Sequence, residues 1–170
     1  MNKLIVPLII ILAAVMRLLP HPPNFTPIIA IGLFGGAYIK NRSLGILIPI
    51  TAMFISDLFL GFHNIIYWVY GSLFMIVLIG TLLHNKVNLK NCIAASLSGS
   101  FLFFFVTNFG VWFTGAYPKS MEGFLACYTL ALPFFGNTLA GTMFYSGVLF
   151  GGYELIKRNF IEIPPDYLQN

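Results

Sequence analysis

The sequence predicts an all-α membrane protein in which six transmembrane helices form one bundle. Of its 170 residues, 58% are hydrophobic and only 8% are charged, and the mean hydropathy is +0.88. Soluble domains carry about 25% charged residues. Long apolar runs also recur along the chain, separated by short stretches that hold most of its charges and prolines. A chain of this kind buries its surplus apolar surface in a lipid bilayer.

The apolar runs define six candidate spans, at residues 4–19, 28–39, 44–60, 65–83, 92–113 and 124–152. A helix needs about 20 residues to cross the hydrocarbon, so the fourth and fifth runs fit best. The second would be only about 18 Å long, and it either begins earlier, near Pro27, or is re-entrant. The sixth contains Pro133, Gly136 and Asn137, so we expect one kinked or broken helix there.

These spans form one predicted domain. We expect a six-helix transmembrane domain over residues 1–156 and a short polar C-terminal tail over residues 157–170.

Basic residues indicate the orientation, because short loops on the cytoplasmic side are enriched in Lys and Arg. If all six segments cross and the N-terminus is inside, only Arg17 and Lys119 lie outside. The inner side then holds Lys3, Lys40, Arg42, Lys86, Lys90, Lys157 and Arg158. The bias predicts an inner (plasma) membrane protein with both termini in the cytoplasm. If the second segment failed to cross, Lys86 and Lys90 would move outside and the bias would weaken.

Most other polar residues gather at the outer ends of the helices in this topology. Arg17 and Asp57 have similar depths, and a charge near the hydrocarbon costs several kcal/mol unless it is paired or hydrated. We expect them to pair or to face one outer cavity. The alternative is that Arg17 reaches lipid headgroups and Asp57 only caps or solvates a helix end. The candidate ligand-binding residues are Arg17, His21, Asn24, Asp57, His63, Asn108, Trp112, Tyr117 and Asn137.

Aromatic residues accompany this polar set. They form either an interfacial belt or the wall of a pocket, in which Trp112 and Tyr117 stack on or cover a ligand. His21, His63 and Asp57 are residue types that bind metals, but their spacing matches no ligand pattern. We therefore predict no metal and no cofactor.

Two glycine pairs, Gly32/Gly36 and Gly147/Gly151, have the spacing that lets helices approach closely. We expect both pairs to pack helices within the chain, with docking of a partner membrane protein as the alternative.

The sequence contains no Walker A loop, Rossmann glycine fingerprint, HExxH or GxSxG motif. We therefore expect no enzyme activity and no ATP hydrolysis by this chain. A membrane enzyme acting on a lipid would have to use Asp57 with His21 or His63. The positive charges are scattered rather than clustered, which argues against nucleic acid as a partner.

Five stretches carry a resemblance to known proteins: RLLPHPPNFTPI (17–28), LFGGAY (33–38), SDLFLGF (56–62), TNFGVW (107–112) and PFFGNTL (133–139). Together they resemble an uncharacterised family of small bacterial multi-pass membrane proteins. In size and helix number the chain is also similar to the S components of energy-coupling factor (ECF) transporters. That resemblance implies a vitamin or related micronutrient bound from the outer side, and as partners a transmembrane coupling subunit and ATPases.

The leading functional hypothesis is an integral membrane protein that binds a small molecule for uptake. Arg17, Asp57 and Asn108 would then contact the ligand from an outward-facing pocket between the helices. The alternative is a non-transporting membrane scaffold or assembly subunit, in which the glycine faces pack against a partner protein.

Overall fold

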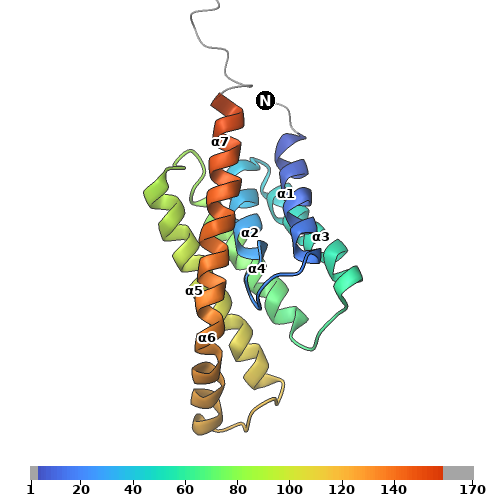
Figure 1. The fold of residues 1–170 in the computed structure, drawn as a ribbon, viewed down its shortest axis with the longest axis vertical. Helices are drawn as coiled ribbons and strands as arrows, with labels where there is room; N and C mark the ends of the chain where they lie inside the picture. Colours follow the sequence, from blue (N-terminus) through green and yellow to red (C-terminus); the bar gives the residue numbers. More distant parts are fainter. Residues whose placement is uncertain (1–3, 159–170) are drawn as a thin grey trace, which may run out of the picture.

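The computed structural model describes residues 4–158, and every regular element among them is a helix. Its elements in chain order are α1 (Ile5–Val15), the 3₁₀ turn η1 (Met16–Leu18), α2 (Ile28–Tyr38), α3 (Arg42–Leu60), α4 (Ile66–Thr81), α5 (Leu89–Phe113), α6 (Met121–Ser146), the π-helical turn η2 (Gly147–Gly151) and α7 (Gly152–Ile156). The start of α1 and the end of α7 lie at the same end of the molecule (Figure 1). The predicted all-α class is confirmed. Apart from Lys157 and Arg158, the predicted polar tail lies outside the described residues.

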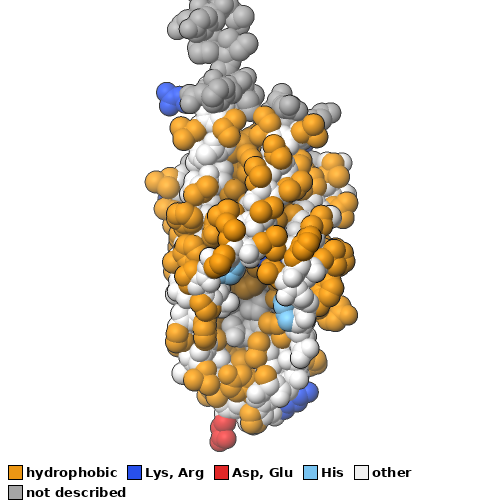
Figure 2. All heavy atoms as spheres, turned by 45° about the vertical axis from the view of Figure 1, so that its right-hand side comes forward, with side chains coloured by type: hydrophobic (Ala, Val, Ile, Leu, Met, Phe, Trp, Pro, Cys, Tyr) orange, Lys and Arg blue, Asp and Glu red, His pale blue; other side chains and the backbone are white. Residues whose placement is uncertain are grey.

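Three helices of the described chain are long and apolar enough to cross a membrane. They are α3, α5 and the continuous helix that runs from Met121 to Ile156. Only a minority of the residues in their most apolar stretches are buried, and hydrophobic side chains cover much of the face seen in Figure 2. A surface of this kind is stable in lipid rather than in water. The remaining apolar helices, α1 with η1, α2 and α4, are shorter.

The shortest of the predicted spans is the centre of the bundle. Helix α2 begins directly after Pro27, and ten of its 11 residues are buried. It contacts α1, α3, α4, α5 and α6. At about 16 Å it is too short to cross the hydrocarbon alone, but its neighbours shield its ends from lipid. A helix enclosed by protein need not reach both membrane surfaces.

Glycines allow α2 and α4 to pack backbone against backbone. A Cβ atom at Gly36 would overlap the carbonyl oxygen of Val77 and lie 2.9 Å from the Cα of Gly80. A Cβ atom at Gly80 would in turn overlap the carbonyl oxygen of Leu33. The expected packing role of the Gly32/Gly36 pair is therefore confirmed, since a Cβ at Gly32 would also lie 2.9 Å from Leu73.

The second glycine pair behaves differently. A Cβ atom at Gly147 or Gly151 would meet nothing within 4 Å among the described atoms, so the expected packing within the chain is wrong for this pair. These glycines lie in η2, whose buried residues are Leu149 and Phe150. The π turn directs those two side chains to the core and leaves the glycines on the outer surface.

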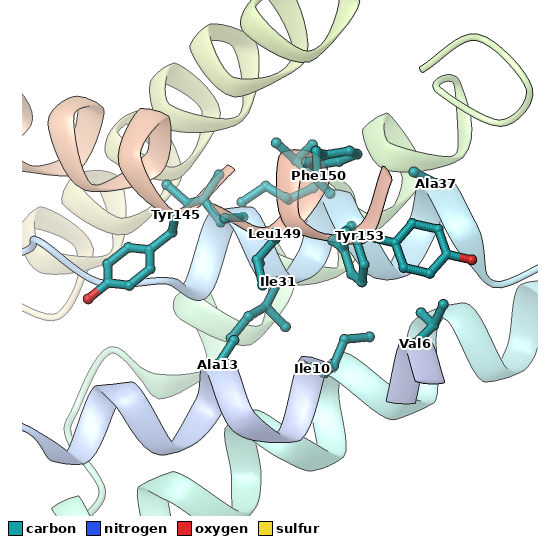
Figure 3. Packing of buried hydrophobic residues seen from close by; sticks show 14 of the residues in the cluster. Val6, Ile10, Ala13, Ile31, Ala37, Tyr145, Leu149, Phe150 and Tyr153 are labelled. Atoms are coloured by element: carbon teal, nitrogen blue, oxygen red, sulfur yellow. The ribbon is translucent and has the colours of Figure 1, made fainter. Parts of the chain in front are cut away.

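We expected the last long helix to be kinked or broken at Pro133, Gly136 and Asn137, and a break at these residues is wrong. Helix α6 runs through Pro133 and Asn137 without interruption, and the irregular turn comes later, at η2. One proline removes only one backbone hydrogen bond, which a long helix with many others tolerates. Figure 3 shows how the far part of this helix joins the core. Tyr145, Leu149, Phe150 and Tyr153 belong to the buried cluster that also contains Ile31 and Ala37 of α2 and Val6, Ile10 and Ala13 of α1.

We predict that Gly36→Ala destabilises the protein, because its Cβ would push α2 and α4 apart. Overpacking of this kind costs about 1–3 kcal/mol. Gly71→Ala is the matched control, since Gly71 lies in α4 with nothing within 4 Å of its Cβ position. Thermal unfolding of the detergent-purified variants, followed by circular dichroism, checks this. Equal stability of the two variants would show that the α2–α4 backbone contact is absent.

Candidate functional site

Arg17 and Asp57 form a buried ion pair. Arg17 lies in η1 with 9% of its surface exposed, and Asp57 lies in α3 with 1% exposed. The Nη1 atom of Arg17 is 2.8 Å from Oδ1 of Asp57 and also donates to the hydroxyl of Ser56. Of the outcomes expected from the sequence, pairing is confirmed, and the alternative in which Arg17 reaches lipid headgroups is wrong.

Tyr70 completes the environment of the carboxylate. Its hydroxyl, from α4, donates to Oδ2 of Asp57 at 2.7 Å, so both carboxylate oxygens accept a hydrogen bond. Three elements, η1, α3 and α4, are thereby joined at one point.

A cavity of about 500 Å³ adjoins this ion pair, and its size is in the usual range for small-ligand sites. Figure 2 shows a hollow with histidine side chains at its rim. The polar lining residues are Arg17, His21, Asn24, Thr26, His63, Thr107, Asn108 and Thr138. The apolar lining residues are Ile28, Ile29, Met53, Ile65, Val69, Phe103 and Val111. The structure thus brings together Arg17, His21, Asn24, His63 and Asn108 of the residues predicted from the sequence.

The other predicted residues do not line the cavity. Asp57 lies behind Arg17 as its counter-ion. Trp112 donates from its indole nitrogen to the carbonyl oxygen of Pro118 and packs against Phe124, while Tyr117 lies in the loop after α5. These two aromatic residues are therefore not positioned to stack on a ligand in this cavity.

Asn137 does not line the cavity but holds the loop beside it. Its side-chain amide donates to the carbonyl oxygen of Pro23 at 3.0 Å, in the loop between η1 and α2. Asn24 follows with φ of 63°, a left-handed conformation that Asn tolerates better than most residues. Gly141 of α6 lets the same loop approach closely, because a Cβ there would lie 3.0 Å from the Cα of Phe25. Helix α6 thus holds the loop that presents His21 and Asn24 to the cavity.

The side chains that line the cavity favour a ligand that carries hydrogen-bond acceptors. None of the described lining residues is acidic, and the charge of Arg17 is balanced by a carboxylate outside the lining. The Nε atom of Arg17 is buried without a hydrogen-bond partner in the described structure. Thr107, Asn108 and Thr138 each already donate to a backbone carbonyl oxygen of their own helix. The unpartnered donor of Arg17 suits a neutral or anionic ligand better than a cation. Within residues 4–158 no group of three or more His, Cys, Asp and Glu side chains is placed to hold a metal ion.

Sequence reasoning missed Tyr70 and the apolar half of the lining. Tyr70 carried one usable signal: Asp57 and Tyr70 lie at similar distances on either side of the loop between α3 and α4. Antiparallel neighbours joined by a short loop place such residues at the same depth. The apolar lining residues, such as Met53 and Val69, carry no signal, because apolar residues occupy every face of these helices.

A comparison with protein families places the chain. The model of a family of unknown function, DUF6580, matches residues 1–165. The chain belongs to this family. No curated protein and no solved structure matches it. The expected membership in an uncharacterised family is confirmed, while the match is silent on any likeness to S components.

We predict strong coupling between Arg17 and Asp57 in stability. Asp57→Ala leaves a buried guanidinium without its counter-ion, and breaking a buried pair in this way costs about 3–5 kcal/mol. Arg17→Met combined with Asp57→Ala costs less than the sum of the single changes, because neither charge is then left unpaired. Tyr70→Phe removes one hydrogen bond to a charged group and costs about 1.5–3 kcal/mol. Unfolding of the four variants in detergent measures these effects, and additive single changes would contradict the pairing.

Proposed function

We propose that this protein is a membrane-embedded binding protein for the uptake of a small molecule, in the manner of an ECF transporter S component. One observation carries the proposal: a ligand-sized cavity joins apolar walls to polar side chains that include the Arg17 guanidinium, and none of its described lining residues is acidic. A purely structural polar cluster would pack its side chains against one another. Here His21, His63 and Asn108 line a hollow instead.

The arrangement of the loops supports six crossings. Lys40, His84 and Lys157 line a common hollow near the end of α2, so their segments lie at one end of the molecule. The loop after α5, which carries Lys119, lies at the opposite end (Figure 1). With the basic end in the cytoplasm, the cavity at Arg17 opens toward the outer side. We therefore propose an inner (plasma) membrane protein with both termini inside.

Energy for transport would come from partners. The described residues hold no phosphate-binding loop, so the proposal includes a transmembrane coupling subunit and ATPases. The chain itself would contribute the binding step, and neither nucleic acid nor a metal has a role in it.

We predict binding of a water-soluble vitamin that carries a carboxylate, because the lining supplies donors and no acid. Equilibrium dialysis of the purified protein against a panel of radiolabelled vitamins tests this prediction. Val111→Trp fills the cavity and weakens binding by at least about tenfold, or about 1.4 kcal/mol. Leu97→Trp is the control, because Leu97 lies on the same helix with 47% of its surface exposed and outside the lining.

Equal binding by the two tryptophan variants would refute the site. A protein partner that always co-purifies, with no binding of any vitamin, would favour the scaffold alternative.

A second prediction concerns orientation. In a chain whose native Cys92 and Cys127 are replaced by alanine, Lys119→Cys reacts with a membrane-impermeant maleimide added to intact cells, because its loop lies outside. Lys86→Cys reacts only after the cells are permeabilised. The reverse labelling pattern would place the cavity on the cytoplasmic side and remove the basis for uptake.

A further inference from the structure

Two adjoining hollows lie at the end of the molecule away from the Arg17 cavity. One, of about 460 Å³, lies among the ends of α2, α4 and α7, and the other, of about 340 Å³, lies between the start of α5 and the helix α6–η2–α7. They share Val87 and Glu154 in their linings, so they lie side by side, and the two together are called the depression here. Its two parts differ sharply in chemistry.

The first hollow is basic. Lys40, Lys157 and His84 line it, and Glu154 is the one acidic residue among its described lining residues. That carboxylate is already engaged: Tyr38 donates to Oε1 at 2.5 Å, and Nζ of Lys157 lies 3.9 Å from Oε2. Among the described lining residues the two lysines exceed the single carboxylate, which leaves a net positive charge at the level where three helices end.

The second hollow is an apolar trench along the helices. Leu89, Ile93, Met143 and Phe150 line it, and the hydroxyls of its two serines, Ser96 and Ser146, bond to each other at 3.0 Å. Gly147 and Gly151 also line the trench, and a Cβ at either position would meet nothing within 4 Å. These positions therefore leave room for a chain to lie close against the backbone of η2.

We propose that this depression binds one anionic phospholipid, with its phosphate headgroup beside Lys40 and Lys157 and one acyl chain in the trench. The order of the two parts matches an amphiphile: basic groups lie at the helix ends, and the apolar trench extends toward the membrane interior. A soluble anion would leave the trench unused. A transmembrane helix of a partner, about 10 Å wide with its side chains, would leave the lysines without a counter-charge.

This site is distinct from the uptake cavity and does not depend on it. Anionic headgroups attract basic residues at the membrane surface, and each lysine contributes about fivefold to affinity. The trench adds selectivity for a lipid over a free phosphate ester, because an acyl chain packs against the apolar side chains that a soluble ester leaves uncovered.

Native mass spectrometry of the detergent-purified protein tests the proposal. The probes are phosphatidylglycerol and phosphatidylcholine with identical acyl chains, and glycerol 3-phosphate as a soluble headgroup. We expect phosphatidylglycerol to bind in preference to both others. Lys40→Gln with Lys157→Gln weakens its binding by about 25-fold and removes the preference over phosphatidylcholine. Lys86→Gln with Lys90→Gln is the charge-matched control, because neither residue lines either hollow.

Separate variants test the role of the apolar trench. Gly147→Leu with Gly151→Leu fills it and weakens phosphatidylglycerol binding, while Gly136→Leu, on α6 and outside both linings with an equally open Cβ position, has no effect. Unfolding temperatures of all variants show whether the fold is intact. Three results would each overturn the proposal: equal binding of the two lipids, equal losses from the two lysine pairs, or binding of glycerol 3-phosphate as tight as that of phosphatidylglycerol.

Discussion

The close contact between α2 and α4 is the constraint on which the rest of the structure depends. Gly36 and Gly80 let the two backbones touch, and Gly35 brings α2 equally close to Pro49 of α3. Helix α2 is thereby enclosed by the other helices and is only about 16 Å long. Its neighbours extend past both of its ends, which leaves space there. The Arg17 cavity includes Ile28 and Ile29 from its start, and the basic hollow includes Ala37 and Tyr38 from its end. Both hollows therefore follow from one short buried helix.

The ion pair between Arg17 and Asp57 holds part of the wall of one of these hollows, the Arg17 cavity, in place. A buried pair is weak evidence for net stability, because desolvation of two charges offsets much of their attraction. Its clearer effect here is geometric, since Arg17 and Asp57 tie η1 to α3, and Tyr70 adds α4. The guanidinium is then held at the cavity wall with its charge already compensated. A site built in this way presents donors in an apolar setting without an unpaired charge.

The sequence predicted those features whose absence would cost a large amount of free energy. The apolar surplus required a membrane, the isolated Asp57 required a partner at the same depth, and Gly32 and Gly36 marked a close approach. Features set by how far a cavity extends along a helix, or by an irregular helical turn, were out of reach. Trp112 and Asn108 lie four residues apart on α5, yet only Asn108 lines the cavity, and the outward-facing Gly147 and Gly151 depend on a π turn that no residue pattern signals.

The same constraint limits how the proposed transporter could move. If α2 slid along α4, the carbonyl oxygen of Leu33 would have to pass Gly80 and that of Val77 would have to pass Gly36. Tightly packed helices of this kind move between discrete arrangements rather than continuously. The loop between η1 and α2 is held more lightly, by Asn137 and by its approach to Gly141. In the proposed transport cycle, release of a ligand on the inner side would then require either displacement of that loop with reorientation of the bundle as one body, or a partner that turns the bundle. The second route is the one that a coupling subunit would supply.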